Sequence, residues 1–275
     1  MDRPLILITN DDGILSKGLR AAAAACDALG ELLIAAPAVQ QSGAGRSMPP
    51  ASEGRIYPAD VDVNGRALVG YGIEGSPAQV VEHALFEIAP RRVSLVVSGI
   101  NYGENLGESI TVSGTVGAAM EGASFGIPAL AVSRQTEAEL YLSHSADVDF
   151  STAARHVRMF SEAALKWGLP AGVDVLKIEV PQDATPDTPH RWTRISRQRY
   201  FYPTVPHRRR PTDPGPMGYE VRIDEATLEA DSDVRAVAID KVVSITPLTL
   251  DFTARVDFGQ METWLGGAHR NAPHG

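Results

Sequence analysis

Two adjacent carboxylates follow a short apolar run near the start of the chain. The run Leu5–Thr9 ends in the polar turn Asn10-Asp11-Asp12-Gly13. Neighbouring carboxylates repel each other, and this raises the pKa of at least one of them unless a cation neutralises the pair. Their hard oxygen atoms suit Mg²⁺ or Mn²⁺. The turn therefore predicts a divalent metal site, and an ordinary Asn-Asp-Gly surface turn is the alternative.

Two further segments place neutral oxygen atoms after apolar runs. Ser42 follows the run 32–36 and is flanked by flexible residues, including Gly43. Asn101 follows the run 93–97, and its amide oxygen can ligate a metal. Because ligands of an open parallel sheet bind beyond the carboxyl ends of its strands, both segments are expected at the same edge as the acidic turn. A flexible glycine-rich connection is the alternative for the loop around Ser42.

A loop that turns into a helix carries groups suited to an anion. The start of a helix offers free N–H groups, and Ser113, Gly114 and Thr115 add two hydroxyls at such a start. Asn105, a few residues earlier, can donate its amide hydrogens to a phosphate. The sequence has no Walker lysine pattern and no dinucleotide glycine motif after the first strand. A purely structural glycine-rich turn explains poorly why Asn, Ser and Thr gather here.

Alternating strands and helices must position these groups. Apolar runs predict strands, and helices are predicted from alanine-rich or amphipathic stretches and from a capping box at Ser76-Pro77-Ala78-Gln79. The alternation predicts an α/β fold with a mostly parallel sheet and helices on both faces. The predicted strands are 5–9, 32–36, 93–97, 129–132 and 175–180, and the other predicted helices are 19–29, 115–125 and 151–167.

The chain changes character after Pro181. Six prolines fall between Pro181 and Pro211, and the segment from His190 to Arg210 holds seven arginines, four aromatic residues and no acid. An extended arm or hairpin that packs on another subunit is one interpretation, and a surface for nucleotide chains is the other. We divide the chain into a core, 1–181, and an extension, 182–275, with an oligomerisation arm and a segment near 240–256 that returns to the core. The last stretch, 266–275, is polar and expected to be frayed.

Composition narrows the function further. With 275 residues, 44% of them apolar, the chain has the make-up of an ordinary globular protein. Its formal charge of −9 argues against a stable nucleic-acid complex, although a small phosphorylated ligand remains possible. Cys26 is the only cysteine, which excludes an intrachain disulfide and a multi-cysteine zinc site. The sequence has no signal-peptide layout and no apolar stretch long enough to span a bilayer, so we expect a cytoplasmic protein without a membrane partner.

Taken together, these segments resemble the SurE family, the survival-protein nucleotidases that cleave 5′- and 3′-nucleotides with a metal. The match covers nearly the whole chain in the expected order. Its blocks are 6–13, Ala36-Pro37 with Gln41-Ser42-Gly43, 98–107, Ser113-Gly114-Thr115 with Gly126-Ile127-Pro128-Ala129, and a weaker one at 244–248.

The resemblance implies a role for each candidate residue. Asp11, Asp12, Ser42 and Asn101 fall on the family's metal ligands, which implies one divalent ion per subunit, Mg²⁺ or Mn²⁺. The residues that fall around the phosphate are Asn105, Ser113, Gly114 and Thr115. The implied fold is a Rossmann-like α/β domain whose C-terminal extension builds a homodimer or homotetramer.

Three departures from the family pattern remove no metal ligand. Val112 replaces the family's usual tyrosine before Ser-Gly-Thr, and Ser76-Pro77-Ala78-Gln79-Val80-Val81 replaces Thr-Pro-Ala-Asp-Cys-Val. Lys177-Ile178-Glu179-Val180-Pro181 stands where the family has Asn-Val-Asn-Val-Pro. These departures bear on substrate preference rather than on the class of reaction.

The predicted reaction is metal-assisted hydrolysis of a nucleoside monophosphate to nucleoside and phosphate, with Asp11, Asp12 and Asn105 as the catalytic residues. A water activated by the metal attacks phosphorus in line, while Asn105 and the 113–115 turn stabilise the charge on the phosphoryl oxygens. A phosphoenzyme on Asp11 is conceivable but conflicts with its role at the metal. One alternative is a metal-bound nucleotide sensor or assembly protein with little turnover. Another is a phosphatase of short polyphosphate or other phosphomonoesters.

Overall fold

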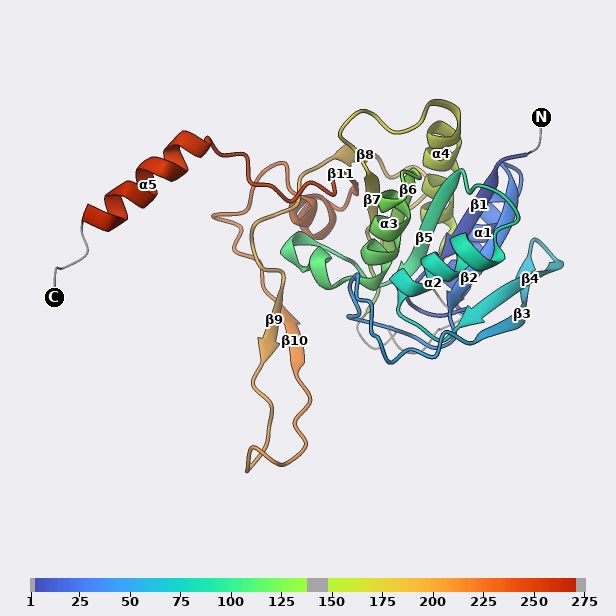
Figure 1. Cartoon of the computed structure of the whole chain (residues 1–275), viewed down its shortest axis with the longest axis horizontal. Helices are drawn as coiled ribbons and strands as arrows, with labels where there is room; N and C mark the ends of the chain where they lie inside the picture. Colours follow the sequence, from blue (N-terminus) through green and yellow to red (C-terminus); the bar gives the residue numbers. More distant parts are fainter. Residues whose placement is uncertain (1–2, 138–147, 271–275) are drawn as a thin grey trace.

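A nine-stranded mixed sheet forms the centre of the molecule. The computed structural model describes residues 3–137 and 148–270 (Figure 1). The strand order in the sheet is β3-β4-β2-β1-β5-β6-β7-β11-β8. The strands are β1 (Leu5–Thr9), β2 (Glu31–Pro37), β3 (Ile56–Val63), β4 (Arg66–Ile73), β5 (Leu95–Tyr102), β6 (Ala129–Arg134), β7 (Val175–Val180), β8 (His190–Trp192) and β11 (Val243–Leu248).

Five neighbouring pairs, from β4 through β7, are parallel, as the alternation of strands and helices predicts. The antiparallel pairs are β3 with β4 and β11 with β7. The fold class predicted from the sequence is confirmed. The chain leaves β1 for β2 on one side and later places β5 on the other side, so a topological switch point lies between β1 and β5. Ligands of open α/β sheets bind at such points, beyond the carboxyl ends of the strands.

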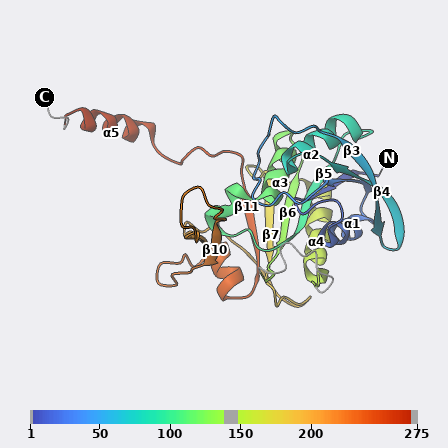
Figure 2. The ribbon, with the colours of Figure 1, turned by 90° about the horizontal axis from the view of Figure 1, so that it is seen from below.

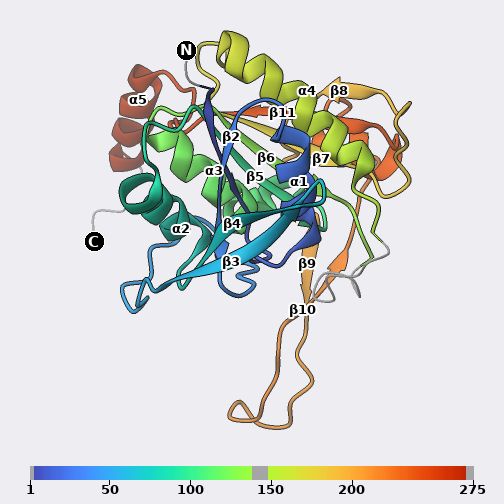
Figure 3. The same ribbon diagram turned by 90° about the vertical axis from the view of Figure 1, so that its right-hand side faces the viewer.

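Helices cover both faces of the sheet (Figures 2 and 3). Two of them, α1 (Lys17–Cys26) and α4 (Ser151–Trp167), pack together on one face, and the apolar cluster there includes Ile8, Val97 and Phe160. The other two, α2 (Pro77–His83) and α3 (Gly114–Ser124), pack on the opposite face. Residues of β1 and β5 belong to both apolar clusters, so these two strands are buried on both faces.

Side-chain caps fix where two of these helices begin. Ser76 accepts a hydrogen bond from the Gln79 N–H at 3.2 Å, and the Gln79 side chain accepts one from the Ser76 N–H at 3.1 Å. This capping box confirms the start predicted for α2. At α3, Ser113 Oγ accepts from the Val116 N–H at 3.2 Å, so the serine of the predicted helix start is its cap.

The β3–β4 hairpin at one edge of the sheet was not predicted. Its turn is Asn64-Gly65, with φ angles of 54° and 76°, which fits the two-residue turn that favours Asn-Gly. The alternation Val61-Asp62-Val63 before that turn, with both valines buried, was a usable signal.

Some C-terminal segments belong to the main sheet, and others lie outside it. β11 lies between β7 and β8 in the main sheet. By contrast, the β9–β10 hairpin (Phe201–Thr204 and Gly218–Val221) projects from the body, and α5 (Phe258–Arg270) lies apart from it (Figure 1). The expectation of a frayed stretch at 266–275 is corrected in part, because α5 continues to Arg270, while 271–275 lie outside the described residues. The division at residue 181 stays a prediction.

Most arginines of the predicted basic arm are engaged within the chain. Arg199 pairs with Glu108 at 3.3 Å, and Arg191 pairs with Asp240 at 2.7 Å. Arg208 at the hairpin tip donates to the Gly215 carbonyl at 2.8 Å, and Arg210 pairs with Asp213 at 3.0 Å. This pairing leaves less positive charge for a nucleotide chain than the sequence suggests. Within residues 3–137 and 148–270, no helix is long and apolar enough to cross a membrane.

The projecting hairpin gives a test of assembly. Replacing residues 205–217 by Asn-Gly closes the hairpin between Thr204 and Gly218, which already pair. If the hairpin packs across a subunit interface, the mass measured by light scattering should fall. A second variant ending at Asp257 removes α5, whose exposed apolar side chains include Phe258 and Trp264. An unchanged mass in the hairpin variant, or a monomeric full-length protein, would reject the hairpin as an interface.

Candidate active site

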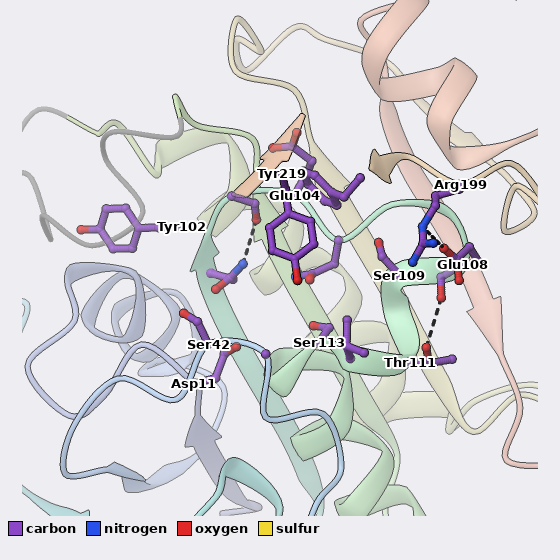
Figure 4. A pocket seen from close by; sticks show the side chains of 16 residues that line it. Asp11, Ser42, Tyr102, Glu104, Glu108, Ser109, Thr111, Ser113, Arg199 and Tyr219 are labelled. Atoms are coloured by element: carbon purple, nitrogen blue, oxygen red, sulfur yellow. Dashed lines mark hydrogen bonds and ion pairs between the residues drawn. The ribbon is translucent and has the colours of Figure 1, made fainter. Parts of the chain in front are cut away.

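Five of the eight predicted site residues line one cavity at the switch point between β1 and β5, while Asp12, next to Asp11 in the turn, is not part of its lining. Thr9 and Ser98 are partners in the register of the two strands, so the turn after β1 lies beside the end of β5. Asp11 and Asn101 line one cavity there, together with Ser42 from the loop after β2 (Figure 4).

Asn10 holds the acidic turn in shape. Its Nδ2 donates to the Gly13 carbonyl at 3.2 Å, and its Oδ1 accepts from the Gly13 N–H at 3.1 Å. Asn10 itself is fully buried, so this clamp is shielded from water. The clamp leaves the carboxylates of Asp11 and Asp12 to other partners, although both residues are more than nine-tenths buried.

The start of α3 packs directly against Asp11. Thr115 Oγ1 donates to Asp11 Oδ1 at 2.6 Å. A Cβ atom placed on Gly114 would lie 2.7 Å from Asp11 Oδ2, closer than real Cβ contacts. Gly114 and Thr115 therefore orient Asp11, and neither of them lines the cavity. The sequence-based expectation for these two residues was contact with a phosphate.

Asp12 is held by two donors. Gln40 Nε2 donates to its Oδ1 at 3.1 Å, and the Tyr102 N–H donates to its Oδ2 at 3.2 Å. Burial, together with the charge of Asp11, nevertheless raises the pKa of Asp12 well above its usual value. Burial also raises the pKa of Asp11. A cation bound beside the two carboxylates would offset both effects and favour their ionised forms.

The oxygen atoms around the acidic turn are suitable ligands for a hard cation. The part of the chain that the structure describes holds no cluster of three or more His, Cys, Asp or Glu side chains able to bind a metal. The available donors are two carboxylates with the neutral oxygen atoms of Ser42 and Asn101, a set that suits Mg²⁺ or Mn²⁺ rather than a soft metal. Asn101 Nδ2 donates to the Gly103 carbonyl at 2.8 Å, which fixes the orientation of its amide.

Asn105 and Ser113 line the same cavity as Asp11, Ser42 and Asn101. Asn105 Nδ2 donates one hydrogen bond to Ser133 Oγ at 2.9 Å. An amide nitrogen carries two hydrogens, so the Asn105 side chain retains a second one for a ligand. Ser113 Oγ accepts from the backbone of α3, which leaves its own hydrogen available to donate.

The cavity also contains residues that sequence reasoning did not assign to it. Its volume is about 410 Å³, within the range of small-molecule sites. Arg199, Phe201 and Tyr219 of the C-terminal extension line it, next to Glu108 and Val112. The aromatic and basic character of the segment after residue 190 was the available signal, but its two interpretations were a subunit contact and a surface for nucleotide chains, not the wall of the cavity.

Comparison with known proteins adds to this geometry. The family model described as "Survival protein SurE" matches residues 6–202. The chain belongs to the SurE family. The resemblance found in the sequence blocks is thus confirmed.

Similar proteins of the SurE family cover nearly the whole chain. The protein named 5'-nucleotidase SurE from Thermococcus gammatolerans is 44% identical over 262 residues, which cover 95% of this chain and 96% of that protein. Its namesake from Thermococcus kodakarensis is 42% identical and covers 94% and 98%. The crystal structure of the SurE protein from Aquifex aeolicus superposes with a TM-score of 0.71 at 30% identity, covering 96% of this chain and all of that one.

The contact of Gly114 with Asp11 makes a prediction for activity. Gly114→Ala places a methyl group against the Asp11 carboxylate, so either the carboxylate or the start of α3 must move. A displacement of about 1 Å can cost about 10²-fold in rate, and we expect a loss of that order in kcat/KM. Gly266→Ala in α5 is the matched control, because nothing lies within 4 Å of its added Cβ. Equal activity of the two variants would contradict the role given to Gly114.

Proposed function

We propose that this chain hydrolyses nucleoside monophosphates to nucleoside and phosphate in a metal-dependent reaction. The observation that carries the proposal is the cavity in which Asp11, Ser42 and Asn101 meet Asn105 and Ser113. Its close relatives are named 5'-nucleotidases, which supports the same reaction here. A phosphate ester is negatively charged. A cation held by the carboxylates and the neutral hydrogen-bond donors can both bind that charge, so the site suits a phosphate ester.

The cation would be held by Asp11, Asp12, Ser42 and Asn101, with one Mg²⁺ or Mn²⁺ ion in each subunit. When bound, such an ion polarises a phosphoryl oxygen and neutralises charge that develops in the transition state. Thr115 and Gln40 orient the two carboxylates through the hydrogen bonds described above.

Asn105 and the start of α3 would bind the phosphoryl group. Ser113 lines the cavity and caps α3, and the positive end of this 11-residue helix favours an anion there, although Gly114 and Thr115 themselves do not line the cavity. The free hydrogen of the Asn105 amide and the hydroxyl of Ser113 add two donors, and donors aimed at developing charge are a large part of catalysis. Together these residues orient the ester for attack at phosphorus.

The rest of the cavity supports a nucleoside as the leaving group. Phe201 and Tyr219 supply aromatic faces, and each of the nucleobases can stack on an aromatic ring. Val112, which stands where the family usually has tyrosine, is 57% exposed at the same cavity. We propose that these three side chains influence which base is preferred.

Assembly and location remain predictions. We propose a homodimer or a homotetramer, supported by the projecting hairpin and by the exposed apolar side chains of α5. A cytoplasmic location and the lack of a stable nucleic-acid complex follow only from the sequence arguments.

A phosphate-release assay with a panel of substrates tests the proposal. The panel contains 5′- and 3′-monophosphates of each nucleoside, short polyphosphate and p-nitrophenyl phosphate, all with manganese. We expect the highest kcat/KM with a nucleoside monophosphate. Higher kcat/KM with polyphosphate would favour the alternative phosphatase, and no release from any compound would favour the sensor.

A further inference from the structure

Three fully buried charged side chains contact the main chain of Asn105 and Gly107. Lys177 and Glu179 come from β7, and Asp233 comes from the residues just before the short helix η4 (Arg235–Ile239). Lys177 Nζ lies 2.9 Å from Asp233 Oδ2 and 3.6 Å from Glu179 Oε1. None of the three side chains is exposed to solvent. We call these three residues the buried triad.

The buried triad holds the main chain around Asn105. The Asn105 N–H donates to Glu179 Oε2 at 2.9 Å, and Lys177 Nζ donates to the Asn105 carbonyl at 2.8 Å. The Gly107 N–H donates to Asp233 Oδ2 at 3.1 Å. Both peptide groups of Asn105 are thus fixed by charged partners, and hydrogen bonds to charged groups are stronger than those between neutral groups.

Stability alone is a poor explanation for this arrangement. Burying charged side chains carries a large desolvation cost, and well-packed apolar residues often stabilise a protein equally well. The triad has two carboxylates for one cation, and burial raises the pKa of Glu179 to about 7 despite the nearby Lys177. Glu179 Oε1 has no hydrogen-bond partner within the described parts of the chain.

The triad joins two parts of the chain that are far apart in sequence. Lys177 and Glu179 belong to β7 of the core, and Asp233 from the C-terminal extension completes the ion pair with Lys177.

We infer that Lys177, Glu179 and Asp233 are positioning residues for phosphoryl transfer, which act by fixing Asn105 through its main chain. The inference rests on the proposed function, because it assigns the triad to the residue that would contact the phosphate. Through Asp233, the same contacts make the geometry of Asn105 depend on the C-terminal extension.

Glu179→Ala tests this inference, because it removes the acceptor for the Asn105 N–H and leaves Lys177 and Asp233 as a matched pair. Loss of a charged hydrogen bond should raise the hydrogen-exchange rate of the Asn105 amide by about tenfold or more. With manganese and the best nucleoside monophosphate, kcat should fall by about tenfold or more, with KM and manganese affinity within about twofold of wild type. Glu179→Gln keeps an oxygen acceptor and should recover most of both losses.

Asp240→Asn is the control, since Asp240 pairs with Arg191 and Arg235 and, among the residues that the structure describes, has no hydrogen bond or ion pair to residues 104–107. It should change neither the exchange of Asn105 nor kcat. If Glu179→Ala does not fold, Asp233→Asn takes its place, with Gly107 as the monitored amide. Unchanged exchange and unchanged kcat in a folded triad variant would overturn the inference. The exchange measurement needs no turnover, so a wild type without phosphate release would count against the proposed function separately.

Discussion

Asn105→Ala should lower kcat by about 10²–10³-fold, the usual cost of losing one donor to a reacting oxyanion. Asn105 lines the cavity, and its Nδ2 already donates to Ser133, which fixes the direction of the remaining hydrogen. The substitution leaves Asp11 and Asp12 in place, so manganese affinity measured by calorimetry should stay within about twofold. Added manganese should not restore the rate, because the substitution does not lower the occupancy of the metal site.

Ser133→Ala is the informative companion to this variant. It keeps the Asn105 amide but removes the acceptor at 2.9 Å that orients it. The loss in kcat should therefore be smaller than that of Asn105→Ala, with the same unchanged metal affinity. A larger loss in Ser133→Ala than in Asn105→Ala would mean that Asn105 is not the donor.

Asp12→Asn should weaken metal binding. The substitution keeps the size of the side chain but removes one of the two buried negative charges. Changes next to a metal ligand typically cost about 10–100-fold in affinity, and loss of a charged ligand should cost at least as much. In a manganese titration of the steady-state rate, half-saturation should move to higher concentration, and excess manganese should recover part of kcat.

Asp60→Asn is the matched control, since it removes the same charge from an exposed position on β3. Its manganese titration should superpose on that of the wild type. If Asp12→Asn binds metal normally while Asn105→Ala is rescued by metal, the two roles assigned here are reversed.

Local patterns were enough to predict most of the sheet and helices. Leu5–Thr9, Val175–Val180 and Ser151–Trp167 have the bounds expected from the sequence. Each of them is an apolar or amphipathic run closed by a polar, proline or glycine residue. The acidic turn could be placed at the edge of the sheet for the same reason, because a buried strand ends directly before it.

Contacts between distant residues could not be predicted in the same way. Thr115 donates to Asp11 across 104 positions of sequence, a contact that the sequence did not indicate, while its expected place around the phosphate stays a prediction. Which way a hydroxyl at a helix start points depends on the strand that the helix packs against. Lys177 and Glu179 alternate with apolar residues in a strand buried on both faces, and only the fold brings Asp233 to them.

The C-terminal extension was predicted in character but not in detail. Proline and arginine indicated an arm, and the structure has a projecting hairpin there. Phe201 and Tyr219 line the cavity because of the orientation of that hairpin relative to the central sheet. Local sequence patterns do not predict such an orientation.

We propose that a divalent cation at Asp11 and Asp12 is needed for hydrolysis of nucleoside monophosphates. The most direct test is a manganese titration of phosphate release by protein that has been treated with a chelator and dialysed. We expect no measurable release without metal, and a rate that rises with manganese to a plateau at one ion per subunit. Full activity in the chelated, dialysed protein would contradict the claim.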